Sequence, residues 1–253
     1  MNVSNCQRSI WPSLCVAQEN LKTMSNLPKA GNRTYERFTP ENTTFLLVDY
    51  NIGFSVVANS QSVTENMRSA KAVLKMAIGY NAGLIFNLGV GQTPFPVLAE
   101  VLGDRPILWR GAELNAFDSP KVVEAVEKLG RSHLVVAGLT TEGCVGHTAM
   151  SAIRKGYTVA IAVDATAGET REAHEIALQR LIQAGVIPYT WGSLLNEFQG
   201  SWQNAKTAQT YFNILGEASP EQSYYFTMVA KAQAADSAKQ PQATAAPATA
   251  ARR

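Results

Sequence analysis

The stretch His133-Leu-Val-Val-Ala-Gly-Leu-Thr-Thr-Glu-Gly-Cys144-Val-Gly decides the fold of this chain. Residues 133–139 form a largely apolar run, typical of a strand that is buried on both faces of a parallel sheet. Gly138 interrupts this run, and small residues from about Gly143 then predict a helix. We therefore expect Cys144 at the carboxyl end of a buried strand, on the first turn of the next helix.

Strand and helix patterns alternate along the chain on both sides of this stretch. Apolar runs predict further strands at 45–49, 83–88, 107–109, 158–164 and 187–191. Helical spacing and capping residues predict helices at 62–80, 94–102, from Ser119 as N-cap with Pro120 next, and at 170–184. Six strands that alternate with helices predict an α/β fold: a three-layer α/β/α sandwich, Rossmann-like, around a doubly wound, mostly parallel sheet.

Composition divides the 253 residues into four segments. Residues 1–37 mix polar and isolated apolar residues, which predicts a poorly ordered N-terminal extension. The α/β domain is expected at 38–215 and a helical extension at 216–231. Residues 232–253 are rich in Ala, Gln, Pro and Lys, which predicts a disordered tail.

Charge and cysteine content limit the classes of partner and compartment. A net charge of +2 argues against nucleic acid or an acidic membrane as the main partner, and no apolar run reaches the 18 residues of a membrane span. Cys6, Cys15 and Cys144 are too scattered for a disulfide framework. Leu14-Cys15 faintly suggests a lipoprotein site, but no hydrophobic run precedes it. We therefore expect a cytoplasmic protein with a small-molecule substrate.

Cys144 is the first candidate for chemistry. At a helix start, unpaired N–H groups and the positive end of the helix dipole lower a cysteine pKa toward neutrality, which makes the reactive thiolate available. The alternative is a small buried hydrophobic residue, the usual role of a lone cysteine.

Three further polar residues follow the ends of predicted strands: Asp49, Arg110 and Asp164. Ligands bind beyond the carboxyl ends of such strands. A buried carboxylate at Asp49 could collect the thiol proton and return it to a leaving amine. The alternatives are a loop cap for Asp49, a surface cation for Arg110 and a turn-fixing role for Asp164.

Four motifs in this order carry a family resemblance. They are Leu-Leu-Val-Asp49, Arg110-Gly-Ala-Glu-Leu-Asn-Ala-Phe-Asp118, Ala-Gly-Leu-Thr-Thr-Glu-Gly-Cys144-Val and Asp164-Ala-Thr-Ala-Gly. Together they resemble the isochorismatase-like cysteine hydrolase superfamily, which includes nicotinamidases. Gln183-Ala-Gly-Val-Ile-Pro-Tyr-Thr-Trp191 and Trp202-Gln-Asn resemble its YcaC-like branch.

The resemblance implies an Asp–Lys–Cys triad. The aspartate matches Asp49 and the nucleophile matches Cys144, but Arg110 occupies the position of the lysine. Arginine stays protonated and offers a different donor geometry, so it cannot exchange protons as lysine can. The resemblance also implies a cis peptide at Leu139–Thr140, with the N–H groups of Thr140 and Cys144 forming an oxyanion hole.

The resemblance extends to the pocket and the assembly. It implies a pocket lined by Asn115, Phe117 and Phe54, and a homo-oligomer, either a tetramer or an octamer. No histidine lies between Asp49 and His133, so the metal cluster of nicotinamidases is missing and we expect no metal.

Other histidines and glycines give weaker signals. His147 could form a Cys–His dyad with Cys144, but a packed or solvated role is the alternative; His133 and His174 are expected to be structural or exposed. Gly89-Val-Gly91 lacks the third glycine of a dinucleotide-binding fingerprint, so we expect no cofactor and give little weight to a nucleotide-binding dehydrogenase.

Two functions remain open on this sequence. The first is a cofactor-independent cysteine hydrolase that cleaves a small amide or related C–N bond through a thioester. The second is a weak or silent relative that serves as an oligomeric, ligand-binding scaffold, and the missing lysine motivates it. Unusually fast alkylation of Cys144 at pH 6 is the observation that would favour the enzyme.

Overall fold

The computed structural model describes residues 36–239, with side chains described up to residue 232. Contacts divide the chain between Arg37 and Phe38, and every element described below belongs to the second unit. The described residues include only the last two residues of the predicted N-terminal extension and the first part of the predicted tail. Cys6 and Cys15 lie outside them. The predictions for these segments therefore remain predictions.

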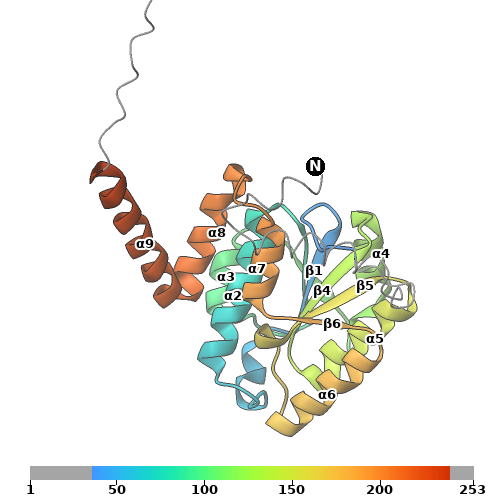
Figure 1. Ribbon diagram of the computed structural model, residues 1–253. Coiled ribbons are helices and arrows are strands. Elements are labelled where there is room, and N and C mark those ends of the chain that lie inside the picture. Colours follow the sequence, from blue (N-terminus) through green and yellow to red (C-terminus); the bar gives the residue numbers. More distant parts are fainter. Residues whose placement is uncertain (1–35, 240–253) are drawn as a thin grey trace, which may run out of the picture. The chain divides into compact units, whose positions relative to one another are not determined.

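The sheet has six strands, all parallel, in the order β3-β2-β1-β4-β5-β6 (Figure 1). The strands are β1 Thr43–Val48, β2 Gly83–Gly89, β3 Ile107–Arg110, β4 His133–Gly138, β5 Thr158–Ala162 and β6 Ile187–Tyr189. The predicted doubly wound fold is confirmed, and each predicted strand is present with shifts of a few residues at its ends. The strand order reverses direction between β1 and β4, so the switch point of the sheet lies between these two strands.

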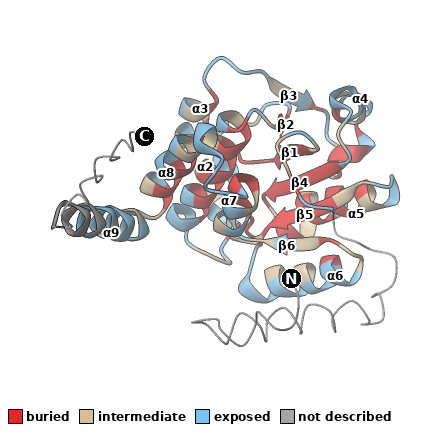
Figure 2. Ribbon diagram, turned by 45° about the horizontal axis from the view of Figure 1, so that its top comes forward, coloured by how far each residue is buried: buried red, intermediate tan, exposed pale blue. Residues whose placement is uncertain are grey.

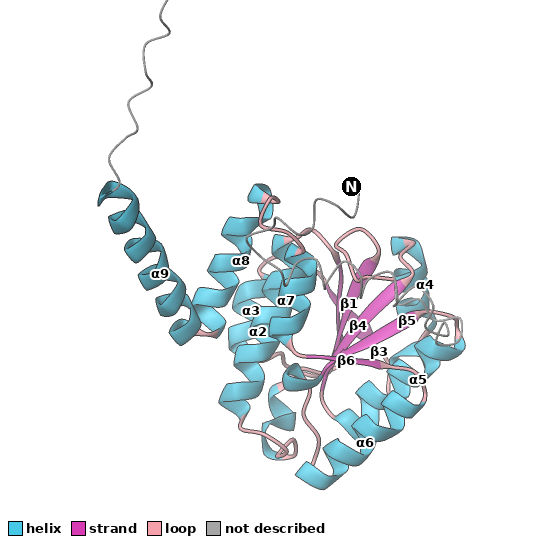
Figure 3. Ribbon diagram, in the orientation of Figure 1, coloured by secondary structure: helices cyan, strands magenta, loops and turns pink. Residues whose placement is uncertain are grey.

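Helices cover both faces of the sheet, as Figure 3 shows. The elements of one layer are α2 Val63–Gly79, α3 Pro96–Leu102, α7 Trp191–Gln199 and α8 Ala205–Ala218. The elements of the other are α4 Pro120–Leu129, α5 Gly146–Arg154 and α6 Arg171–Gln183. Four short turns, η2 Ile52–Val56, η3 Ala116–Asp118, η4 Thr141–Val145 and η5 Val163–Ala165, connect them at the carboxyl ends of strands.

Successive side chains of β1 point to opposite faces of the sheet and belong to two separate hydrophobic cores. Phe45 and Leu47 pack with α2, α3, α7 and α8, whereas Leu46 and Val48 pack with α4, α5 and α6. All four side chains are fully buried, and Figure 2 shows the central strands as the most buried part of the molecule. A continuous apolar run in the sequence therefore corresponds to a strand covered on both faces.

Two helix starts show how local sequence sets the boundaries. Ser62 caps α2, because its hydroxyl accepts the N–H of Glu65 at 3.2 Å. At α4, Pro120 occupies the first helical position as predicted, but the side chain of Ser119 makes no capping hydrogen bond. The N-cap prediction for Ser119 is thus right in position and wrong in its hydrogen bond.

Two of the C-terminal helices, α7 and α8, were not expected from the sequence pattern, whereas a helical extension was expected at 216–231, where most of α9 lies. The predicted strand 187–191 ends at Tyr189, because Thr190 and Ser193 form a capping box that begins α7 at Trp191. α8 lies against α2, where Glu217 forms ion pairs with Lys71 and Lys75. The last helix, α9, runs from Pro220 to Lys239, across the predicted start of the tail. No helix among the described residues is long and apolar enough to cross a membrane.

Candidate active site

Asp49 directly follows β1, at the switch point of the sheet. Its side chain is completely buried, and its backbone N–H donates to the carbonyl of Asn87 at 2.9 Å. Its φ is +56°, a left-handed conformation that costs a non-glycine residue on the order of 1 kcal/mol or more. This backbone conformation ends the strand at Val48 and begins the turn that carries the carboxylate.

The carboxylate of Asp49 forms a bidentate ion pair with Arg110. One guanidinium nitrogen donates to Oδ1 at 2.8 Å and the other donates to Oδ2. Arg110, only 3% exposed, also donates from Nη1 to Oδ1 of Asn87 at 2.7 Å and from Nε to the carbonyl of Glu113 at 2.8 Å. Arg110 is therefore a buried partner of Asp49, and the alternative of a surface cation is excluded.

The environment of Arg110 favours its charged form. Burial lowers its pKa, but the hydrogen bond and negative charge of Asp49 outweigh this and raise the pKa above its ordinary value. A fork of five donors suits two carboxylate oxygens and one amide oxygen at once, which a lysine ammonium cannot match. The arginine therefore fixes the position of the carboxylate.

Asn87 is a site residue that the sequence analysis missed. It lies fully buried in β2, accepts from Arg110 and donates from Nδ2 to the carbonyl of Leu108 at 2.8 Å. A polar residue inside the apolar run Gly83-Leu-Ile-Phe-Asn-Leu was the available signal, because a buried amide needs hydrogen-bond partners.

Cys144 lies on an irregular segment between β4 and α5, which we name the cysteine turn (residues 139–145). The predicted helix from Gly143 is wrong at its start: Gly143 has φ −100° and ψ −114°, and regular helix begins at Gly146. The expected cis peptide is present at Leu139–Thr140. Cys144 is half-buried and packs against the core that contains α4, α5 and α6.

The carboxylate of Asp49 acts on the thiol of Cys144. Burial first, and then the negative charge and acceptor oxygens of Asp49, raise the pKa of Cys144 to about 12, although Arg110 and the cysteine's own backbone N–H act in the opposite direction. The predicted lowering toward neutrality is therefore wrong. The Cys144 side chain is desolvated, and the positive charge nearest to it is already engaged by Asp49.

Hydrogen bonds fasten the cysteine turn to the segment before α6. The N–H of Thr141 donates to the carbonyl of Ala167 at 3.0 Å, and the N–H of Glu169 donates to Oε1 of Glu142 at 2.8 Å. The Thr141 hydroxyl and Nδ1 of His174 are 2.6 Å apart. His174 therefore contacts the turn that carries the thiol, a role no sequence pattern indicated.

The environment of His174 favours the neutral ring. Burial lowers its pKa, while the charges of Glu142 and Glu175 act in the opposite direction. The second carboxylate oxygen of Glu142, Oε2, is buried without a hydrogen-bond partner beside Gly168. The anchor of the cysteine turn thus contains two titratable side chains.

The three pocket residues implied by the resemblance lie in different surroundings. Phe54 lines a hollow of about 10 Å³ together with Leu139 and other apolar residues, so it lies beside the cysteine turn. Asn115 accepts from the N–H of Phe117 and donates to Ser151 at 3.0 Å, so its amide is engaged within its own loop. Phe117 is buried, with its ring edge-on to Tyr157.

Two other side chains that the sequence offered for the site, Asp164 and His147, lie outside it. Oδ1 of Asp164 accepts the N–H of Trp191 at 2.9 Å, which ties η5 to the start of α7 and fits the turn-fixing role. His147 is exposed, and the side chains that shift the pKa of the thiol are Asp49 and Arg110, so the described residues contain no Cys–His dyad. Within residues 36–239 no three His, Cys, Asp or Glu side chains are grouped closely enough to hold a metal ion.

Comparison with known proteins shows what this chain is similar to. Residues 91–193 match the isochorismatase domain. The "Probable hydrolase YcaC" of Escherichia coli is 29% identical over 176 residues, which are 68% of this chain and 85% of that protein.

Two solved structures give the same relationship. YcaC from Pseudomonas aeruginosa, described with hexane-2,5-diol and covalent acrylamide, has a TM-score of 0.74 at 25% identity and covers 79% of this chain and 100% of its own. YcaC from Escherichia coli, described as an octameric hydrolase of unknown specificity, has a TM-score of 0.70 at 26% identity and covers 78% and 100%.

Proposed function

The chain is an isochorismatase-like hydrolase of the YcaC type, and from that premise we propose that it cleaves a small amide or related C–N bond with Cys144 as nucleophile. The observation that carries this proposal is the buried carboxylate of Asp49, which Arg110 holds in place and whose charge acts on the thiol of Cys144. A thiol whose pKa is about 12 needs a base at the moment of attack, and Asp49 is positioned as that base.

The proposed reaction begins from the neutral thiol. Sγ of Cys144 attacks the carbonyl carbon while its proton moves to Asp49, which gives a tetrahedral oxyanion. Asp49 then returns the proton to the nitrogen as the C–N bond breaks, and the amine leaves a thioester on Cys144. Water, deprotonated by Asp49, attacks the thioester and releases the carboxylic acid with the thiol restored.

Backbone donors at the cysteine turn are proposed to hold the oxyanion. The N–H groups of Gly143 and Val145 already donate to the carbonyl of Thr140, and that of Thr141 donates to Ala167. We assign the oxyanion to the N–H groups of Thr140 and Cys144, which are neighbours of these donors in the chain. Arg110 contributes by holding the carboxylate in one orientation.

The test is a screen of small amides by ammonia release, with mass spectrometry of acid-quenched protein to detect the thioester. Turnover should disappear in Cys144→Ala, and the trapped mass should map to Cys144. A Cys6→Ala/Cys15→Ala variant is the matched control and should keep full activity. Unchanged turnover in Cys144→Ala would falsify the assignment.

A second candidate function is a catalytically weak scaffold that binds ligands. The raised thiol pKa and the engagement of both Asp49 oxygens by Arg110 favour it. Slow alkylation near pH 6 is expected from either function, so alkylation does not separate them. Amide turnover does: a broad amide panel with no turnover, under conditions in which the protein is folded, favours the scaffold.

We also propose that the chain forms a homo-oligomer, because the similar Escherichia coli YcaC is described as octameric. Light scattering after size exclusion should give a multiple of the 27.3 kDa chain mass. A monomer at micromolar concentration would contradict this proposal.

A further inference from the structure

A second cavity lies between α5 and α6, beside the cysteine turn. Its volume is about 220 Å³, which is room for roughly seven water molecules at the ~30 Å³ each occupies in the liquid. Thr141, Glu142 and Gly146 form part of its lining, but Cys144 and Asp49 do not. The groove is therefore separate from the candidate catalytic groups.

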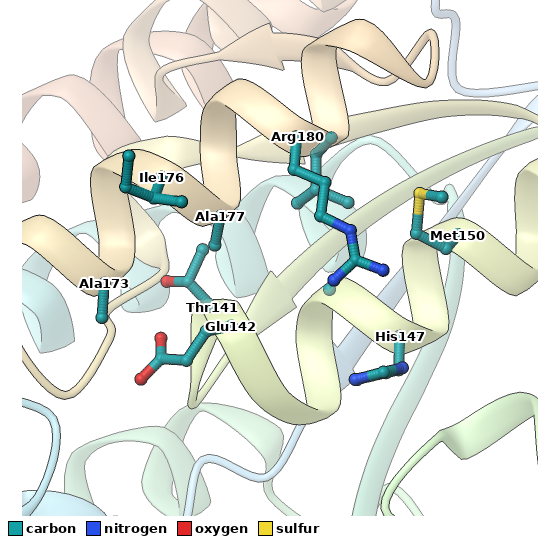
Figure 4. A pocket seen from close by; sticks show the side chains of 10 residues that line it. Thr141, Glu142, His147, Met150, Ala173, Ile176, Ala177 and Arg180 are labelled. Carbon is teal, nitrogen blue, oxygen red and sulfur yellow. The ribbon is translucent and has the colours of Figure 1, made fainter.

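Two basic side chains from facing helices meet in this groove. Figure 4 shows the guanidinium of Arg180 extending from α6 toward the ring of His147 on α5. Neither side chain has a hydrogen bond or ion pair with any described residue. An unpaired guanidinium beside an imidazole is a set of donors suited to an anion.

The acidic residue of the groove lies away from this basic end. Figure 4 places Glu142 on the side opposite Arg180 and His147. One of its oxygens accepts the N–H of Glu169, and the other lies against Gly168, so the carboxylate is engaged with the neighbouring segment. Among the described residues, Arg180 therefore has no counter-ion.

The remaining walls are apolar. Met150 on α5 and Ile176 and Leu181 on α6 line the groove, and Ile176 is 63% exposed. An apolar wall next to a cationic end fits a compact molecule with one carboxylate and a short hydrocarbon body. A free inorganic anion would leave this wall unused.

We propose that the groove between α5 and α6 is a binding site for a small organic carboxylate, with Arg180 and His147 holding the carboxylate and Met150, Ile176 and Leu181 contacting the hydrocarbon part. The site is distinct from Cys144 and does not depend on the proposed amide hydrolysis. Because Thr141 and Glu142 belong to both the groove and the cysteine turn, an occupant contacts the segment that positions the thiol.

The experiment is calorimetric titration of the full chain with benzoate at low ionic strength, in the wild type and in Cys144→Ala. Benzyl alcohol, which has the ring without the carboxylate, is the ligand control. We expect saturable benzoate binding with a Kd of about 1 mM in both proteins, and no measurable binding of benzyl alcohol. Arg180→Gln should weaken benzoate at least tenfold.

Arg171→Gln is the matched protein control, since Arg171 is an exposed arginine on the same helix and does not line the groove. It should bind benzoate as the wild type does. The proposal is overturned by an absence of saturable binding, by equal affinity in Arg180→Gln, or by loss of binding in Cys144→Ala, which would place the benzoate at the thiol instead. Added salt should weaken binding, because the contact is between charges near the surface.

Discussion

The two halves of the candidate site are built in opposite ways. Asp49, Asn87 and Arg110 lie at the ends of β1, β2 and β3, are buried, and have their charged and amide groups satisfied by one another. Cys144 lies on an irregular, half-buried turn, which side-chain and backbone hydrogen bonds attach to the segment 167–174. The acid is held by the sheet and the thiol by a neighbouring loop.

This contrast separates what the two halves contribute. A bidentate pair inside the sheet has one low-energy arrangement, so we expect its geometry to stay the same when a ligand binds. The turn is held in part by His174, whose pKa is lowered by burial and whose charge state can therefore change with pH. The orientation of Asp49 is thus set by the core, whereas the position of Cys144 can change when the anchor of the cysteine turn changes.

The largest expected loss of stability comes from a substitution at the contact between β1, which leads to Asp49, and β4, which leads to the cysteine turn. Gly138 pairs with Val48 in the sheet, and a Cβ at Gly138 would lie 1.9 Å from the carbonyl oxygen of Val48. Its φ of +151° also disfavours a side chain. Gly138→Ala should therefore separate β1 from β4 and lose more than about 4 kcal/mol of unfolding free energy, measured by urea denaturation.

Gly143→Ala provides the matched control within the cysteine turn. The added Cβ would lie 2.7 Å from Oγ1 of Thr140, a side-chain atom that can rotate away. A loss of about 1 kcal/mol is expected. Similar losses for the two variants would show that the turn is as constrained as the sheet, and the two halves would then not differ.

The second effect concerns the buried ion pair. Arg110→Met leaves the carboxylate of Asp49 buried without its cation, and removing one partner of such a pair costs about 3–5 kcal/mol. Lys155→Met is the control, because Lys155 and Glu127 form an exposed pair at 3.8 Å. That loss should stay below about 1 kcal/mol. Equal losses in the two denaturation curves would mean that the pair at Asp49 contributes no more than a surface contact.

The sequence predicts the sheet half of the site better than the turn half. Continuous apolar runs place Asp49 and Arg110 at strand ends, and parallel strands bring such ends to one edge. Their pairing follows from topology, and the structure contains it. The apolar pattern alone does not predict the left-handed backbone at Asp49. It also does not predict α7, which begins with a capping box, or α8, which follows a polar loop.

The turn half depends on contacts that no local pattern encodes. His174 is about thirty positions from Thr141, and only the packing of α6 against the turn brings their side chains together. The prediction of a lowered thiol pKa is wrong for a related reason. It considers the helix dipole but not the carboxylate of Asp49, which the sheet places near the sulfur. The sign of the shift depends on that long-range neighbour.

The third effect tests how the carboxylate controls the thiol. Asp49→Asn removes the charge and the ionised acceptor that raise the pKa of Cys144, while Arg110 remains. The thiol pKa should fall, so iodoacetamide alkylation of Cys144 at pH 8 should rise, by about tenfold. Amide turnover should fall in the same variant because the base is lost.

Opposite changes in alkylation and turnover are the signature of this arrangement. The alkylation rate is followed by peptide mass spectrometry, which separates Cys144 from Cys6 and Cys15. Asp164→Asn is the matched control, since Asp164 is a partly buried acid at another strand end that does not shift the thiol pKa. Slower alkylation in Asp49→Asn would refute the role assigned to the carboxylate.

The smallest effect is a pH dependence at the anchor of the cysteine turn. Burial lowers the pKa of His174, so the unfolded chain, with a histidine pKa of about 6.5, takes up the proton first as pH falls. Stability from the neutral ring is therefore complete above pH 6.5 and is lost as pH falls from there toward the lower native pKa. His174→Gln should flatten the unfolding free energy in that window and cost about 1 kcal/mol at pH 8 through the lost bond to Thr141.

His147→Gln supplies the comparison for this measurement, because His147 is exposed and outside the anchor. It should keep the wild-type unfolding free energy at pH 8, because the bond between His174 and Thr141 is intact in this variant. If the anchor positions the thiol, the rate of Cys144 alkylation in the wild type should also change across this window beyond the change in thiolate fraction, and His174→Gln should abolish that extra change. A pH profile identical in all three proteins would leave the cysteine turn as fixed as the pair of Asp49 and Arg110, and the contrast between the two halves would be lost.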